Sequence, residues 1–373
     1  MKSILRNKWF KFSIALIICL LMIVWVGNYW LLLGLPILFD VYISKKVHWA
    51  FWKKKGVAKQ SATVEWIDAI IFAVVAATII RMFFIEAYTI PTSSMEKSLL
   101  VGDYLFVSKV AYGPKIPNTP LSFPFAHHTM PTTTKTKSYL EWINWPYKRL
   151  AGITEIKRND VVVFNFPAGD TIIVGQENPD YYSRIRQIVN SIKGSDMKKG
   201  RQVQADSYYK KIARKHLADN NEISSRPVDK RENYIKRCVA MPGDTILSID
   251  GQLFINGKKQ IKIENLQYRY QVNTNGSLIN PRKLDEMHVT KSEIGQNGST
   301  YSMPLSQEKA EQLGKLSNVS SIVKMTYNVG VPEEVIPFSD HYTWNRDNFG
   351  PCLLYTSPSP RDNIANLVFR LRL

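Results

Sequence analysis

The sequence predicts a mainly β domain that is preceded by transmembrane helices and interrupted by a helical insertion. Two long apolar stretches occupy the first part of the chain. Short runs of β-branched and aromatic residues follow, separated by turn residues, as is typical of strands. One polar segment, residues 168–232, has helical spacing instead. The 45% hydrophobic and 21% charged content is typical of a folded chain rather than a disordered one.

The first apolar region, residues 12–43, is too long and too uncharged for a soluble helix. Gly27 and Asn28 interrupt it, and Gly34 and Pro36 weaken its second half. The region is therefore either a hairpin of two short helices or one long tilted span. We favour the hairpin, because it puts the basic residues on both sides of the region in the same compartment.

The second apolar region predicts a single transmembrane helix over residues 65–86. Its apolar core, Trp66 to Ile85, would be roughly 30 Å long at about 1.5 Å per residue, which matches a bilayer core. Six lysines lie in the preceding loop, residues 44–64. Basic loops stay in the cytoplasm, so we expect residues 1–11 inside as well and everything after Glu86 outside.

The predicted β domain comprises residues 87–167 and 233–351. Asp250-Gly251 and Asn256-Gly257 are turn pairs typical of hairpins. Ser306 begins a short helical pattern over 305–317. The predicted strands are Tyr104–Val107, Asp160–Phe166, Lys236–Val239, Thr245–Ile249 and Leu253–Ile255.

The net charge of +18 suits either a nucleic acid or an anionic membrane as partner. The densest lysines flank the apolar regions and no nucleic-acid motif is present, so we expect a lipid bilayer as partner and no nucleic acid. The three cysteines form no CxxC pair, and the six histidines show no metal-ligand spacing. We therefore expect neither a metal nor a cofactor.

Two segments contain residues with catalytic potential. Ser94 follows a proline directly after the second apolar region, where serines are commonly turn formers. Lys236 lies inside an apolar β run, where an ammonium group is costly to bury. Lys236 either points to solvent or is neutralised by desolvation and acts as a base.

Taken together, four segments resemble the conserved boxes of type I signal peptidases, in the family's order. Ile90-Pro-Thr-Ser-Ser-Met95 resembles the nucleophile box, and Lys236-Arg-Cys-Val-Ala-Met-Pro-Gly-Asp244 resembles the lysine box. Lys157-Arg-Asn-Asp-Val-Val-Val-Phe164 and Asn345-Arg-Asp-Asn348 resemble the two remaining boxes. The likeness covers roughly residues 65–167 and 233–351, and it implies a signal-peptidase-like β fold.

The resemblance implies a role for each matching residue. Ser94 would be the nucleophile and Lys236 the general base. The Ser94 backbone N–H and the Thr92 hydroxyl would form the oxyanion hole. The residues that would line shallow substrate pockets, or ordinary β core instead, are Ile90, Pro91, Met95, Leu99, Tyr234 and Ile235.

The last box departs from the family pattern. Thr343-Trp344 replaces a Gly-Asp pair, and Phe349 replaces a serine that helps to orient the lysine. Thr343 could take over that orienting role, with Phe349 as an apolar wall; another group or a water could do so equally well. Arg237 and Asp347 are further residues expected to support the site.

The resemblance implies a membrane-bound serine endopeptidase that removes N-terminal signal peptides from exported preproteins. It also implies the bacterial inner (cytoplasmic) membrane, with the catalytic domain on the extracytoplasmic face. One alternative is a Ser-Lys protease dedicated to a specific exported partner. Another is an inactive membrane scaffold that binds protein export machinery through the 168–232 insertion.

Residues 352–373 follow Pro351 abruptly. Residues 352–362 can be back-translated into a string that resembles the adapter used in transposon-based DNA library preparation. We therefore expect this tail to be non-native and assign no function to Cys352.

Overall fold

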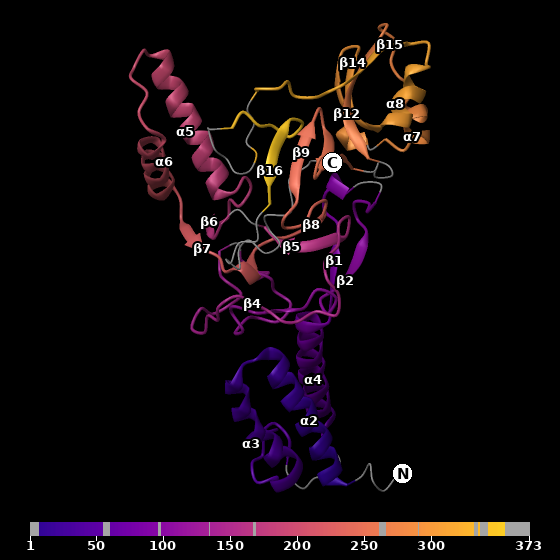
Figure 1. The fold of residues 1–373 in the computed structure, drawn as a ribbon. Helices are drawn as coiled ribbons and strands as arrows, with labels where there is room; N and C mark the ends of the chain where they lie inside the picture. The colour runs from indigo at the N-terminus through magenta and orange to yellow at the C-terminus, as the bar shows by residue number, and fades with distance from the viewer. Residues whose placement is uncertain are drawn as a thin grey trace. The chain divides into compact units, whose positions relative to one another are not determined.

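The protein is represented by a computed structural model (Figure 1). It describes residues 7–54, 60–95, 98–133, 135–166, 169–260, 266–289, 291–331, 335 and 342–354. The chain forms two compact units, which we describe separately. Unit 1 comprises Met1–Tyr88, Phe106–Ile156 and Ala168–Glu232, and unit 2 comprises Thr89–Leu105, Lys157–Pro167 and Asn233–Leu373.

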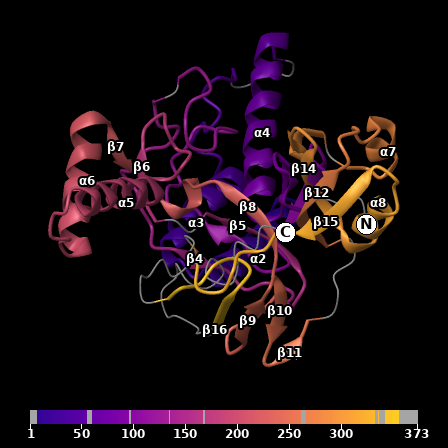
Figure 2. The same ribbon diagram turned by 90° about the horizontal axis from the view of Figure 1, so that it is seen from above.

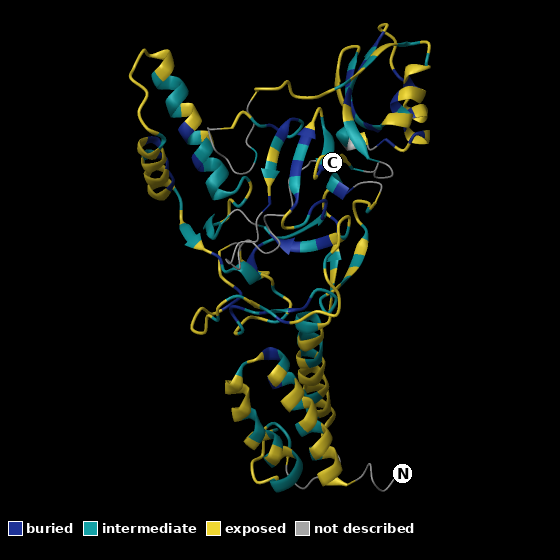
Figure 3. Ribbon diagram, viewed as in Figure 1, coloured by how far each residue is buried: buried dark blue, intermediate teal, exposed yellow. Residues whose placement is uncertain are grey.

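Unit 1 begins with helices that are apolar and largely exposed (Figure 3). Two of them, α2 (Lys8–Val26) and α4 (Ala62–Phe83), are long and apolar enough to cross a membrane. Between them lie the shorter segments η1 (Tyr29–Leu33), α3 (Gly34–Phe39) and η2 (Asp40–Ser44).

The chain reverses direction after α2. Gly27 ends the helix in the left-handed conformation with φ 65°, and its N–H donates to Ile23 O. This conformation is easily adopted only by glycine. The rings of Phe12 on α2 and Phe39 on α3 then lie 5.7 Å apart. Residues 12–43 thus fold back on themselves in the structure, and their arrangement across a membrane stays a prediction.

The polar segment at 168–232 contains a helical hairpin on a base of two short strands. Helix α5 (Tyr181–Lys198) is capped by Asp180, and it packs against α6 (Asp206–Asn220) (Figure 2). Apolar residues of both helices form one buried cluster with Ile173. The base strands β6 (Thr171–Ile173) and β7 (Ile223–Ser225) are antiparallel. The sequence pattern predicted the helices but not these strands.

Two further strand pairs lie in the chain after α4. Strand β1 (Ile85–Thr89) pairs with β2 (Tyr104–Ser108). Within unit 1, β3 (Lys115–Ile116) pairs with β4 (Lys148–Arg149).

Unit 2 contains a four-stranded sheet in the order β11-β10-β9-β16. The predicted strand at 245–249 is confirmed as β9, and Asp250-Gly251 forms the predicted turn with both φ values positive. The sheet buries Ile246 and Phe349 on one face. Its strands are β9 (Thr245–Ile249), β10 (Gln252–Ile255), β11 (Lys258–Lys259) and β16 (Phe349–Leu353).

The second sheet of unit 2 has the order β13-β14-β12-β15 and was not predicted. Helix α7 (Pro281–Glu286) and helix α8 (Gln307–Gly314), which begins after the predicted cap Ser306, pack on it around a buried cluster. The protein therefore combines helices and strands throughout. The strands are β12 (Gln267–Thr274), β13 (Gly295–Asn297), β14 (Thr300–Ser306) and β15 (Val319–Lys324).

Strand β16 extends to Leu353, so it includes Cys352 from the segment expected to be non-native. Leu354 is also buried in unit 2. The rest of the expected non-native tail, residues 355–373, lies outside the described residues.

Candidate active site

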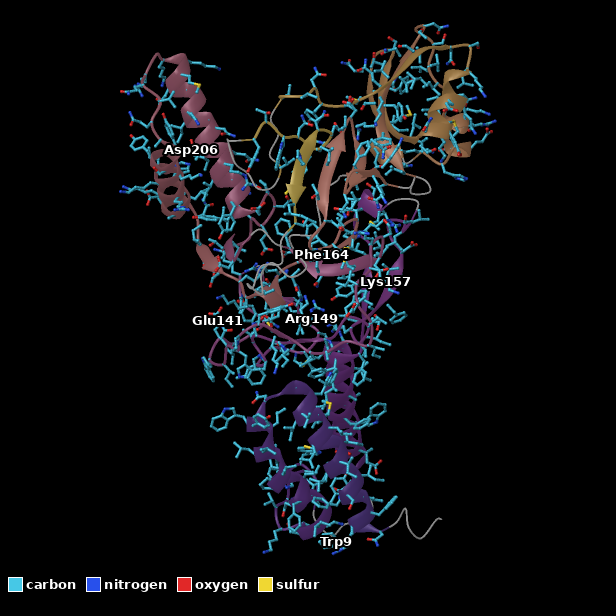
Figure 4. All side chains as sticks on the ribbon, in the orientation of Figure 1. Trp9, Glu141, Arg149, Lys157, Phe164 and Asp206 are labelled. Atoms are coloured by element: carbon cyan, nitrogen blue, oxygen red, sulfur yellow. The ribbon has the colours of Figure 1, made fainter. Side chains whose placement is uncertain are left out.

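Lys236 lies on a two-stranded antiparallel ribbon in unit 2. Strand β5 (Val161–Asn165) pairs with β8 (Asn233–Arg237), and Val162 lies opposite Lys236. Val162 and Phe164 are 3% and 5% exposed (Phe164 is labelled in Figure 4). The lysine is itself half-buried, so its amine is held beside an apolar strand rather than extended into solvent.

Ser94 lies on a short 3-10 turn, η3 (Ser93–Met95), that follows β1. The chain is anchored on both sides of the serine, because Ile90 and Met95 are only 3% and 4% exposed. Ile90 also exchanges backbone hydrogen bonds with the 102–103 segment, at 2.9 and 3.0 Å. The Met95 carbonyl accepts from Leu99 N at 2.8 Å, which closes the turn.

The structure brings the two predicted catalytic side chains together within unit 2. Lys236 Nζ donates a hydrogen bond to Ser94 Oγ and a second, at 3.0 Å, to Ile235 O. The backbone contact restricts where the amine can point. A lysine held in this way can exchange a proton with the serine hydroxyl, provided that it is neutral when it acts as a base.

The remaining nucleophile-box residues divide into buried and accessible ones. Ile90 and Met95 are buried core, whereas Pro91 and Thr92 are exposed and Leu99 is half-buried. The Thr92 hydroxyl has no hydrogen-bond partner in the described part of the chain. It is therefore available to an incoming group, as an oxyanion donor must be.

Tyr234 and Ile235 are the remaining predicted pocket residues, and both are half-buried on β8. The Tyr234 ring stacks on Phe166, with ring centroids 4.8 Å apart. This stack fixes the tyrosine ring on the strand that also carries Lys236.

Arg237 and Asp347 have partners that the sequence did not predict. Arg237 donates to Asn159 O at 2.9 Å and to Ser98 Oγ at 3.3 Å, so it links the lysine strand to the segment after the nucleophile. The Asp347 carboxylate accepts from Tyr327 N at 2.8 Å. Asp347 thus supports the turn that precedes β16.

Two residues of the altered last box, Thr343 and Phe349, differ in their exposure. Thr343 is exposed, and its hydroxyl makes no hydrogen bond within the described residues. Phe349 is 5% exposed and packs with Ile246 and Trp344 in the β9–β16 core. The orienting role of Thr343 therefore remains a prediction without a supporting contact.

An ion pair that the sequence did not single out supports the end of the lysine segment. Arg158 donates to both carboxylate oxygens of Asp244, with Nε to Oδ2 at 2.8 Å. Met241 N and Asn256 Nδ2 also donate to this carboxylate, at 2.7 and 2.8 Å. The Arg158 hydrogen bonds, with the other donors, lower the pKa of Asp244 to about 2. The available signal was that Arg158 and Asp244 each lie within one of the four boxes.

Within the described residues, one group in unit 1 has metal-ligand spacing: His128, Glu177 and Glu232, with ligand atoms within 4.8 Å. Arg226, which is 4% exposed, already donates to both carboxylates, at 2.5–2.9 Å. The hydrogen bonds from one guanidinium to both carboxylates explain why the two acids lie close together.

A serine hydroxyl bonded to a lysine amine on a partly buried strand is the arrangement of serine hydrolases that use a lysine base. The family model described as signal peptidase, peptidase S26, matches residues 63–334. This chain belongs to that family.

Curated relatives are similar over part of their length. Signal peptidase I of Bacillus licheniformis is 23% identical over 207 residues, which is 56% of this chain and 58% of that protein. Signal peptidase I of Rickettsia massiliae (strain Mtu5) is 23% identical over 205 residues, or 55% and 47% of the two chains. The chain thus spans about half the length of these relatives. No solved structure matches it.

Proposed function

We propose that the protein is a membrane-bound endopeptidase that removes N-terminal signal peptides from exported preproteins. The observation that carries the proposal is the hydrogen bond between Lys236 Nζ and Ser94 Oγ in a member of the signal peptidase family. The curated relatives named signal peptidase I support the substrate class.

In the proposed reaction, neutral Lys236 takes the proton of Ser94 Oγ as the oxygen attacks the scissile carbonyl carbon. The resulting lysine ammonium then gives this proton to the leaving amine as the C–N bond breaks, which leaves an acyl-serine. Lys236 next deprotonates a water that attacks the ester, and the released serine oxygen takes the proton back. No metal or cofactor enters these steps.

The Ser94 backbone N–H and the Thr92 hydroxyl would hold the oxyanion. Because Thr92 is exposed and has no partner among the described residues, its hydroxyl can turn toward a developing charge without breaking another bond. Loss of one such donor typically costs about 10²–10³-fold in rate.

We further infer that unit 2 is a β catalytic domain of the signal-peptidase type. Pro91, Leu99, Tyr234 and Ile235 would contact the small residues before the cleavage site, with Ile90 and Met95 supporting them from the core. Arg237 would support the site through its bond to Ser98.

The proposed location is the bacterial cytoplasmic membrane, with unit 2 on the extracytoplasmic face. The two long apolar helices and the lysines in the loop before α4 support this orientation. A reporter that is active only outside the cytoplasm should be active when fused after residue 100. The same reporter should be inactive when fused near residue 57.

The decisive experiment is in vitro cleavage of a preprotein by the full chain in detergent, with and without Ser94→Ala. Wild-type protein should release the mature domain at one site, and the variant should not. A panel of unrelated preproteins separates a general signal peptidase from a protease dedicated to one partner. Equal cleavage by wild type and Ser94→Ala would overturn the proposal.

A further inference from the structure

A cavity of about 640 Å³ lies within unit 1, at the end of α2. Its walls come from the end of α2, from η1, and from the paired strands β3 and β4 with the residues just before β4. Most of the lining is apolar, and the residues used below are Val26, Trp30, Leu32, Ile116, Trp145 and Lys148. A cavity of this size can hold a substantial part of a small amphiphile.

The cavity lies at the level where the two long apolar helices end. The rings of Trp25, on the last turn of α2, and Phe83, the last residue of α4, are 6.3 Å apart. Val26 packs with Ile116 and Leu150 directly beyond this contact. Helix α2 has 19 residues, so at about 1.5 Å each it spans roughly 28 Å, close to a bilayer core.

Tryptophans are concentrated at this level. Trp25 Nε1 donates to Ala151 O at 3.2 Å, Trp145 packs against the Val26 cluster, and Trp30 is 79% exposed beside the cavity. Indole rings favour the boundary between headgroups and acyl chains. The cavity and its surroundings thus contain the aromatic residues expected at a membrane–water interface.

One cation lines the cavity. Lys148 Nζ donates to Val26 O at 2.6 Å and so caps the carboxyl end of α2. Gly27 makes this approach possible, since a Cβ on it would lie only 2.6 Å from Lys148 Nζ. An ammonium group has three N–H donors, and the described residues use one of them. None of the described lining residues is acidic.

We propose that this cavity binds a phospholipid with an anionic headgroup. The headgroup phosphate would accept hydrogen bonds from Lys148, and an acyl chain would lie along Leu32, Ile116 and Trp145. The proposal rests on the membrane location included in the proposed function, but not on the Ser-Lys chemistry. The lipid would join the turn after α2 to the segment before β4 and so hold the hairpin beside α4.

The first test is native mass spectrometry of the full chain after extraction into mild detergent, with added phosphatidylglycerol or phosphatidylcholine. Wild-type protein should retain phosphatidylglycerol, and Lys148→Gln should retain about fivefold less, the effect of one cation near an anionic headgroup. Lys148→Arg should restore retention. Lys210→Gln, at an exposed lysine of α6, makes the same charge change away from the cavity and should behave as wild type.

The second test locates the lipid. Phosphatidylglycerol with brominated acyl chains should quench tryptophan fluorescence in reconstituted wild-type protein. Trp145→Phe should lose the share of the quenching that comes from Trp145. Lys148→Gln should weaken the quenching because less lipid is bound. Inorganic phosphate should not compete, because it lacks the acyl chain.

Equal retention and quenching in wild type and Lys148→Gln would overturn the proposal, as would equal retention of phosphatidylcholine and phosphatidylglycerol. Competition by millimolar inorganic phosphate would also overturn it in favour of a simple anion site. Ser94→Ala should retain the lipid fully. A failure of lipid binding is thus distinguishable from a failure of preprotein cleavage.

Discussion

Two antiparallel ribbons of this protein each carry a lysine on a short strand, and the surroundings of the two lysines differ. Lys236 on β8 contacts Ser94, beside a second cation, Arg237, that points to other partners. Lys115 on β3, in unit 1, is instead close to Arg149 and Lys109. Burial, followed by these two positive charges, lowers the pKa of Lys115 to about 7.

The difference shows that a lysine which titrates near neutrality is not by itself a catalytic base. The pKa of Lys115 is lowered by burial and by the nearby charges of Arg149 and Lys109. Lys236 is the candidate base because a serine hydroxyl lies within hydrogen-bond reach on an anchored turn. A depressed lysine pKa does not by itself identify a base, since geometry has to come before titration in assigning one.

The largest expected effect is the loss of cleavage on substitution of Ser94 or Lys236, compared with no loss on substitution of Lys115. Ser94→Ala and Lys236→Ala should each lower preprotein cleavage by on the order of 10⁴-fold or more, and the double variant should be little worse, because the two groups act as a unit. Lys115→Met should leave cleavage essentially unchanged. Steady-state cleavage in detergent measures all four. Substantial activity in Lys236→Ala would remove the base from the proposed mechanism.

A smaller effect would show how firmly the serine turn is held. Ser93 Oγ donates to the Glu293 carboxylate, which reaches the turn from the short η5 segment (Lys291–Glu293) in unit 2. Glu293→Ala should lower kcat about tenfold with little change in KM, because small misplacements of a nucleophile are costly.

Two variants act as controls for that effect. Glu293→Gln keeps an acceptor for the Ser93 hydroxyl and should recover most of the activity. Ser93→Ala combined with Glu293→Ala should be no worse than either alone, because both remove the same bond. A change confined to KM would assign Glu293 to substrate binding instead.

The third prediction concerns stability and Lys115. Its pKa is about 7 in the folded protein and 10.5 without perturbation, so between these values the unfolded chain binds a proton that the folded chain does not. The free energy of unfolding should therefore rise as pH increases from about 7 to about 10. Asp229 and Glu86 act in the opposite direction but are weaker influences on this pKa.

Thermal unfolding of the full chain in detergent across this pH range measures the effect. Lys115→Met should flatten the dependence, whereas Lys210→Met, at an exposed site on α6, should keep it. An unchanged slope in Lys115→Met would show that Lys115 is protonated throughout in the folded protein.

The smallest expected effect concerns Thr343. Its hydroxyl is exposed and makes no hydrogen bond within the described residues, so Thr343→Val should change turnover little. The sequence alone left a large loss and no loss equally open. A large drop in turnover at unchanged stability would show that substrate binding brings Thr343 to the lysine.

Much of the site could be predicted because its chemistry lies in short contiguous motifs. Ser94 and Lys236 are separated by 142 positions, yet each is marked by its own neighbours in sequence. The strand at 245–249 and its Asp250-Gly251 turn were predictable for the same reason, since hairpin geometry depends on local residues.

The unpredicted features depend on contacts between distant segments. Strands β6 and β7 are three residues each and pair across the whole helical hairpin, so no local period marks them. Arg158–Asp244 and Ser93–Glu293 join positions 86 and 200 apart in the chain. The burial of Ile90 and Met95 likewise follows from packing that their own pattern does not show.

The buried side chain of Asn345 makes four hydrogen bonds, so substitutions there should affect stability rather than chemistry. Its side chain is 0% exposed; Nδ2 donates to Asn328 O and Val331 O at 3.0 and 2.9 Å, and Oδ1 accepts from the backbone N–H groups of Asp347 and Asn348 at 3.0 and 2.7 Å. No other side chain can reproduce all four bonds in that space. In a saturation mutagenesis screen scored by growth, Asn345 should tolerate as few substitutions as Ser94. The two positions would be distinguished only by measuring protein abundance as well as activity. Asn345 variants should be low in abundance, whereas Ser94 variants should be abundant but inactive.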